Sequence, residues 1–158
     1  MVLVDTDVLL IAFRYQRDAR FAVNSSFLSK VKQEEPSITV YNLMEFLGQM
    51  SFNISSDRLR HWDRWLKDEY SLLVVWPEGG DFDANGVLRT EIYDRPFSKM
   101  VETPGGIAFN DALILVLAER AADIDTVVTW NARHFRDKTA LTVLTPEEYL
   151  QRNVSSDQ

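Results

Sequence analysis

Residues 2–10 read Val-Leu-Val-Asp-Thr-Asp-Val-Leu-Leu, and this order predicts how the fold begins. The apolar run from Val2 to Val4 has the composition of a short buried strand, and it ends at Asp5. Apolar residues then recur at helical spacing as far as Phe13. The stretch therefore predicts a strand, a turn and a helix, with two acidic residues, Asp5 and Asp7, at the turn.

The rest of the chain repeats this alternation of short strands and helices. Helices are expected at residues 21–31, from residue 39 through Glu45, from residue 55 through Leu66, at 83–100, at 111–120 and after Thr145, and strands at 36–38, 71–76 (buried), 126–130 and 141–144. Such alternation predicts an α/β fold with a mainly parallel sheet of about four to five short strands and helices on both faces. Ligands of such sheets bind beyond the carboxyl ends of the strands, where Asp5 and the residues after Val128 are expected.

Length and composition narrow the class of protein. The 158 residues match one globular domain, which we place at residues 1–152, with residues 153–158 as a frayed tail. The absence of cysteine excludes disulfides, thiolate zinc sites and cysteine nucleophiles. The first residues carry no basic segment and meet an acidic residue at Asp5, unlike a signal peptide or a membrane anchor. We therefore expect a soluble, cytoplasmic protein without a membrane partner.

The formal net charge of -7 argues against a broad basic surface that holds nucleic acid. An acidic balance also arises when carboxylates gather around divalent cations, because the formal count omits the charge of the ions. Net charge alone therefore leaves nucleic-acid chemistry open.

Three acidic residues from distant parts of the chain are predicted to converge above one edge of the sheet. Asp5 ends the first strand, Glu45 lies inside a helix with Tyr41 and Gly48 on its flank, and Asp111 lies in the first turn of another helix. Each has a structural alternative, because aspartate often caps helices and a helical glutamate is often solvated. For Asp5 and Asp111 the capping and metal-binding interpretations are evenly open, and the combination favours metal.

Carboxylate oxygens suit Mg²⁺ or Mn²⁺, which keep several waters and leave positions for a phosphodiester oxygen and an attacking water. In this hypothesis Asp5, Glu45 and Asp111 bind the metal, whereas Asp7 caps the first helix or supports the ligands from behind. Asn110 is the predicted cap of the helix that carries Asp111. One ion or two ions are both compatible with three carboxylates.

Four ordered segments resemble the PIN domain family: residues 2–10, residues 37–45 (Ser-Ile-Thr-Val-Tyr-Asn-Leu-Met-Glu), residues 110–114 (Asn-Asp-Ala-Leu-Ile) and residues 127–135 (Val-Val-Thr-Trp-Asn-Ala-Arg-His-Phe). The resemblance spans nearly the whole chain, and the compact domain is similar to the toxin of VapBC-type toxin-antitoxin pairs. The resemblance implies a single PIN-like domain that hydrolyses RNA phosphodiester bonds with magnesium or manganese. By analogy it also implies a homodimer and a cognate antitoxin protein as partner.

The resemblance also assigns roles to individual residues. Asp5, Glu45 and Asp111 match the metal-binding acids of the family, and Thr129 and Asn131 match the polar positions that close the catalytic site. Many family members carry aspartate where this chain has Asn131, and an amide binds cations less tightly than a carboxylate. Asn131 therefore puts a second metal and the catalytic rate in question, and residues 77–106 depart from the family pattern.

Two other functions stay open. Phosphatases that form an aspartyl-phosphate also place Asp-x-Asp after a first strand, as in Asp5-Thr-Asp7, although their glycine-rich continuation is missing here. A catalytically weak PIN-like protein that mainly binds RNA or a partner is also compatible with Asn131 and the acidic charge.

Several residues near these segments are interpreted as structural. His134 is expected to have a structural role, and His61 is expected to be a solvated surface residue. Two separated histidines also do not make a convincing zinc site. The four tryptophans are interpreted as core or interface anchors, although Trp130 is also placed to stack a base. A small basic cluster is equally consistent with guiding a phosphate backbone and with a solvated turn: Arg133, Arg136 and Lys138.

Overall fold

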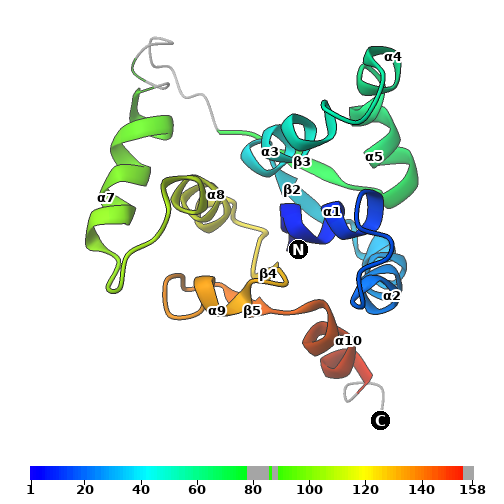
Figure 1. The fold of residues 1–158 in the computed structure, drawn as a ribbon. Coiled ribbons are helices and arrows are strands. Elements are labelled where there is room, and N and C mark those ends of the chain that lie inside the picture. The colour runs from blue at the N-terminus through cyan, green and yellow to red at the C-terminus, as the bar shows by residue number, and fades with distance from the viewer. Residues whose placement is uncertain (78–85, 87–88, 155–158) are drawn as a thin grey trace.

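A five-stranded parallel sheet forms the centre of the molecule (Figure 1). The computed structural model describes residues 1–77, 86 and 89–154. The strands lie in the order β3-β2-β1-β4-β5, and each neighbouring pair is parallel. They are β1 (Val2–Val4), β2 (Ser37–Thr39), β3 (Leu73–Val75), β4 (Thr126–Val128) and β5 (Thr142–Leu144). The predicted α/β class with a parallel sheet is confirmed.

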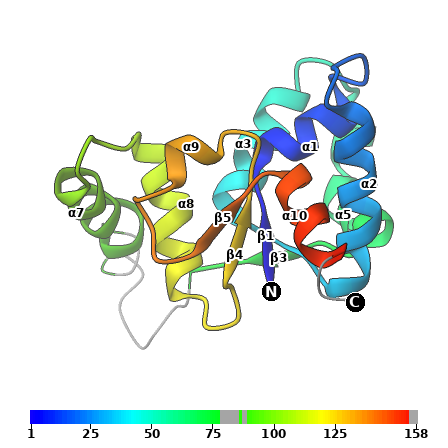
Figure 2. The same ribbon diagram turned by 90° about the horizontal axis from the view of Figure 1, so that it is seen from below.

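Helices cover both faces of this sheet. The α-helices are α1 (Thr6–Phe13), α2 (Phe21–Val31), α3 (Val40–Met50), α4 (Ser56–Leu59), α5 (Trp62–Tyr70), α7 (Arg95–Glu102), α8 (Phe109–Arg120), α9 (Ala132–Phe135) and α10 (Pro146–Val154), with a 3₁₀ helix at Lys32–Glu34 and a π-helix at Thr90–Asp94. In Figure 2, α8 lies on one side of the sheet, and α1, α2 and α10 lie on the other. Within the described residues, no helix combines the length and the apolar character that a membrane span requires.

The first strand shows why the sheet is buried on both sides. Successive side chains of a strand point to opposite faces. Val2 and Val4 pack into the apolar cluster beneath α1 and α2, whereas Leu3 packs into a second cluster beneath α8. A continuous apolar run, rather than an alternating one, is what a parallel strand covered by helices on both faces requires.

The third strand differs from its prediction. Residues 71–76 were expected to form a buried strand, but β3 pairs only with β2 at the edge of the sheet, and Leu73 is 41% exposed. Sequence composition alone does not reveal strand order, and an apolar run at an edge has one side open.

The helix expected at residues 83–100 is only partly within the described residues, because 83–85 and 87–88 lie outside them. The described part consists of the π-helix and α7. Glu91 in the π-helix is buried and pairs with Arg95 and with Arg120 of α8. Residues 155–158 of the predicted tail lie outside the described residues, and residues 153 and 154 belong to α10.

The strand order creates a topological switch point between β1 and β4. The chain runs from β1 outward to β3 and then returns to the other side of β1 as β4, so the order reverses between β1 and β4. Val4 lies opposite Val128 in the parallel register, and the next residues, Asp5 and Thr129, therefore emerge side by side. A switch of this kind is the usual ligand position in open parallel sheets.

Candidate active site

Asp5 is the most deeply buried of the predicted metal ligands. It is 8% exposed, and its backbone N–H donates to the Val128 carbonyl at 3.0 Å, which fixes it against β4. Its Oδ1 accepts from the Thr6 N–H at 2.7 Å and from Asn42 Nδ2 at 2.9 Å. Asp5 is thus the N-cap of α1 and is also held by an amide from α3.

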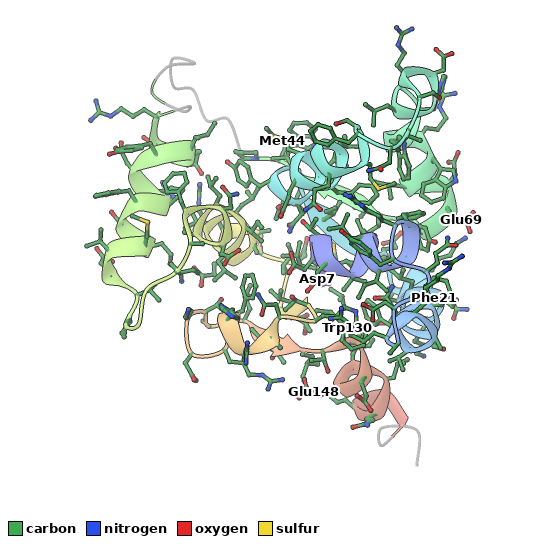
Figure 3. All side chains as sticks on the ribbon, in the orientation of Figure 1. Asp7, Phe21, Met44, Glu69, Trp130 and Glu148 are labelled. Carbon is green, nitrogen blue, oxygen red and sulfur yellow. The ribbon has the colours of Figure 1, made fainter. Side chains whose placement is uncertain are left out.

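Asp7 joins α1 to the segment after β4, and Figure 3 shows it close to Trp130. Thr129 Oγ1 donates to Asp7 Oδ2 at 3.1 Å, and the Trp130 N–H donates to Oδ1 at 3.2 Å. The cap role considered for Asp7 is wrong because Asp5 occupies that position. Asp7 instead holds the start of α1 against the segment that follows β4.

Glu45 reaches the same edge from α3. Its Oε2 accepts a hydrogen bond from Thr6 Oγ1 at 3.0 Å, so the residue that follows Asp5 holds this carboxylate. Glu45 itself is exposed, and the position of a Cβ on Gly48, three residues later, would meet no atom within 4 Å. The space on the Gly48 side of the helix is therefore open.

Asp111 lies in the first turn of α8 and is half-buried. Burial raises its pKa, as does the nearby charge of Glu45, whereas the charges of His134 and Lys138 lower it. The predicted cap at Asn110 is wrong, because the helix begins at Phe109 and its N-cap is Ala108.

No positive side chain that the structure describes is among the main groups that shift the pKa of Asp5, the buried carboxyl group at the end of β1. Burial raises the pKa of Asp5 to about 8, assisted by the charges of Asp7 and Glu45 and opposed by hydrogen bonds from Thr129 and Thr6. Burial likewise raises the pKa of Asp7. A cation among these carboxylates would favour their charged forms and so oppose the effect of burial.

The donors fit a hard divalent ion in kind, since Mg²⁺ and Mn²⁺ prefer oxygen ligands. Across residues 1–77, 86 and 89–154, however, no three His, Asp or Glu side chains converge closely enough to form a preformed ion site. Asp5 is buried, whereas Glu45 is exposed and its carboxylate is bound by the Thr6 hydroxyl. The acids therefore share one edge and influence one another's pKa, and their side chains do not yet form a closed ligand set.

Thr129 and Asn131 follow β4 and differ in environment. Thr129 is fully buried, and its hydroxyl donates to Asp7 and accepts from the Asn131 N–H at 3.0 Å. Asn131 is exposed and is the N-cap residue of α9, without a side-chain capping bond. Thr129 therefore organises the turn, and the Asn131 amide is left facing solvent at the same edge.

Two residues of the site, Thr6 and Asn42, were not identified from the sequence. Asn42 is fully buried, donates to Asp5 and to Thr6, and accepts from Thr39 Oγ1 at 2.6 Å. Thr39 is also the N-cap of α3, with its side chain accepting from the Asn42 N–H. An asparagine three residues after a threonine cap is the only sequence signal, and it resembles ordinary capping.

Replacing Asn42 by alanine is expected to destabilise the protein by about 1–3 kcal/mol, because the Asp5 carboxylate loses a buried donor and the Thr39 hydroxyl loses a buried acceptor. Urea unfolding measures the change. Asn53→Ala is the matched control, since this exposed asparagine makes one bond to the Gln49 carbonyl at 3.3 Å. Equal stability losses in the two variants would contradict a structural role of Asn42 in the site.

The remaining predicted residues are only partly drawn into the site. Of the small basic cluster, Lys138 acts on the Asp111 carboxylate, whereas Arg136 pairs with Glu148 of α10. Trp130 Nε1 donates to the buried Asn24 at 2.8 Å, which anchors its ring to α2. Trp76 is 62% exposed, so the core alternative is wrong for this tryptophan, and the interface alternative stays a prediction.

Comparisons with known proteins define the fold class. No protein-family model matches the chain, and no curated protein sequence matches it. A solved structure of VapBC2 from Rickettsia felis bound to a DNA fragment from their promoter contains a chain that is similar over 92% of this chain and 98% of that one, with TM-score 0.62 and 18% identity.

Two further structures show the same similarity. FitAcB from Neisseria gonorrhoeae matches with TM-score 0.57 and 17% identity over 93% of this chain and 99% of that one. FitAB bound to an IR36 DNA fragment matches with TM-score 0.57 and 15% identity over 92% and 95%. At these identities the likeness shows a shared fold, which covers nearly all of each chain.

Proposed function

We propose that this protein is a metal-dependent endoribonuclease of the PIN domain family and the toxin of a type II toxin-antitoxin pair. The observation that carries the proposal is that Asp5 after β1, Glu45 on α3 and Asp111 on α8 lie at one edge of the sheet, near enough that the charge of Glu45 raises the pKa of both aspartates. The order of the four family-like segments supports the same reading.

Asp5, Glu45 and Asp111 are the residues that would hold Mg²⁺ or Mn²⁺. When bound, the ion would supply a Lewis acid for the phosphate and a water of lowered pKa. The donors are of the right kind, because all three side chains end in carboxylates.

The chain's own residues would orient the reactants. Asn42 and the Thr6 N–H fix Asp5 Oδ1, and the Thr6 hydroxyl restrains Glu45. The exposed Asn131 amide is placed to donate to a phosphate oxygen, with Thr129 holding its backbone.

Positive side chains beside Asp111 would receive the RNA backbone. The charges of Lys138 and of protonated His134 lower the pKa of Asp111, so these side chains lie near the edge at which a phosphate would bind. Local positive charge of this kind on an acidic protein would favour a bound phosphate without a broad basic surface.

An antitoxin partner follows from the same comparison. The similar chains come from complexes named VapBC2 and FitAB, and their names support a toxin-antitoxin relation for this chain. A homodimer in the cytoplasm is the assembly we propose on this analogy.

The test is cleavage of a pool of structured and single-stranded RNA with magnesium, manganese or chelator. Fragments are expected only with metal, and Asp111→Asn is expected to reduce them at least about tenfold because a ligand oxygen becomes a weaker donor. Asp123→Asn is the control, since Asp123 is exposed before β4 at the opposite end of the sheet. Cleavage that persists in chelator would rule out this mechanism.

A catalytically weak RNA-binding protein is the second candidate. The observation that favours it is the lack of a closed three-ligand set among the described residues, together with Asn131. Well-folded protein that binds RNA in chelator and leaves it intact with either metal would establish this function instead.

A further inference from the structure

A hollow adjoins the candidate active site between α3 and α8. Its volume is about 290 Å³, and it is lined by Tyr41, Met44, Glu45, Asn110, Leu113 and Ile114. Two of these residues connect it directly to the site, because Glu45 is a predicted ligand and Asn110 precedes Asp111 on α8. A group in the hollow would therefore lie next to a phosphate held at the carboxylates.

The walls of this hollow, which we name the α3–α8 pocket, combine flat apolar surface with one free amide. Tyr41 and Leu113 are half-buried, and Met44, labelled on α3 in Figure 3, is 65% exposed. The Asn110 side chain is exposed and makes no hydrogen bond to any residue that the structure describes. An exposed thioether and an aromatic ring offer a stacking surface, and the amide offers one donor and one acceptor.

We propose that the α3–α8 pocket binds the nucleobase next to the phosphate that is cut, and so sets the sequence preference of the enzyme. The proposal rests on the nuclease function proposed above. It names the substrate as single-stranded RNA, because only an unstacked base can be turned into a protein pocket. A pocket of this volume lies at the small end of ligand sites, as one base requires.

Charge decides which group of the RNA enters the pocket. Glu45 lines it, and the protein carries a net charge of -7, so a phosphate would be repelled. A base is neutral, and an exocyclic amino group can donate to the Asn110 carbonyl oxygen. Asparagine pairs with the N6 and N7 atoms of adenine, and its amide has the same complementary donor and acceptor for N3 and N4 of cytosine. Adenine and cytosine are therefore expected to bind ahead of uracil, which has no exocyclic amino group.

The pocket would bind the base of a nucleotide, and the positive side chains near Asp111 would bind its phosphate. His134 and Lys138 act on Asp111, and Asn110 on the same helix lines the pocket. A nucleotide lying across the start of α8 would thus place its phosphate at the cations and its base against Met44 and Tyr41.

The first test of the pocket measures binding and does not depend on RNA cleavage. Protein labelled with ¹³C at its four methionine methyl groups is titrated in chelator with each nucleoside 5′-monophosphate, and the Met44 signal is assigned from Met44→Ala. The Met44 methyl is expected to shift with the adenosine and cytidine nucleotides and less with the uridine nucleotide. The methyl of Met50, which is buried in the core, should stay in place. A Met44 methyl that ignores all four nucleotides overturns the proposal and leaves the pocket to an apolar side chain of a protein partner.

Sequencing of cleavage ends from a random single-stranded RNA pool gives the second test. The parent is expected to favour adenine or cytosine at one position beside the cut by about tenfold, the size of one stacked base. Met44→Ala and Asn110→Ala should each reduce that preference at least about threefold. Val101→Ala is the matched control, because Val101 on α7 is also 65% exposed.

The two tests separate the pocket from the nuclease. Cleavage with a preference that both pocket variants retain overturns the pocket and leaves the nuclease function standing. If no RNA is cut, the nuclease function fails, and the methyl titration still decides whether the pocket binds a base.

Discussion

Asp5→Asn is expected to lower metal-dependent RNA cleavage by about two to three orders of magnitude and to remove the stabilisation of the fold by manganese. In the parent, Mn²⁺ at about 100 times its Kd should add about 2.7 kcal/mol to the free energy of unfolding. For a domain of this size that corresponds to a rise in Tm of roughly 5–10 °C. Thermal unfolding with manganese and with chelator measures the difference.

The physical reason is the burial of the Asp5 carboxyl group at the end of β1, next to other carboxylates. Folding raises the pKa of Asp5 from 3.8 to about 8, mainly by burial and then by the charge of Asp7. Without metal, the folded state keeps a proton that the unfolded state has released. The free energy of unfolding therefore falls as pH rises from about 4 toward 8. Asparagine carries no charge, and at neutral pH the metal-free variant should be at least as stable as the parent.

The thermal unfolding data distinguish a variant that has lost the metal from one that has lost its fold. A variant that lost activity because it unfolded would show a lower Tm in chelator, whereas Asp5→Asn should not. Asp123→Asn, which changes an exposed carboxylate at the other end of the sheet, should keep both the cleavage and the full manganese response. An unchanged manganese response in Asp5→Asn would place the ion elsewhere.

The architecture was predictable because strand ends and helix starts leave strong local signals. The apolar run before Asp5 has the pattern of a strand buried on both faces, and the parallel order then brings Thr129 to the same edge. The capping box at the start of α10 was also predictable from the sequence. Thr145 N–H donates to Glu148 Oε2 at 2.8 Å, and the Glu148 N–H donates to Thr145 Oγ1 at 3.2 Å. These features depend on residues a few positions apart.

The fine structure of the site was not predictable because it depends on how separate elements meet. Asn42 lies 37 residues from Asp5, and no local pattern distinguishes its buried amide from an ordinary first-turn asparagine. The partners of Asp7 lie more than 120 residues away, after β4. The α3–α8 pocket likewise arises from the spacing of two helices, so Met44 and Asn110 had no visible connection.

Phe46 anchors the helix that carries Glu45, and Phe46→Ala is expected to cost about 3–5 kcal/mol of stability. The ring is fully buried and meets Phe13 and Trp62 edge to face, with centroid distances of 5.6 and 5.2 Å. Truncation removes the buried ring and both aromatic pairs, and leaves a cavity that the sheet on one side cannot fill. Urea unfolding measures the loss.

Met44→Ala is the matched control on the same helix, because its 65% exposed side chain should change stability by less than about 0.5 kcal/mol. A domain of this kind has a total stability of about 5–15 kcal/mol, so the Phe46 variant would lose a large share of it. Because Glu45 is adjacent in sequence, loosening of α3 should also weaken the manganese response while the protein is still folded. A loss below about 1 kcal/mol for Phe46→Ala would show that the aromatic cluster does not fix α3, and that Glu45 is positioned by its bond to Thr6 alone.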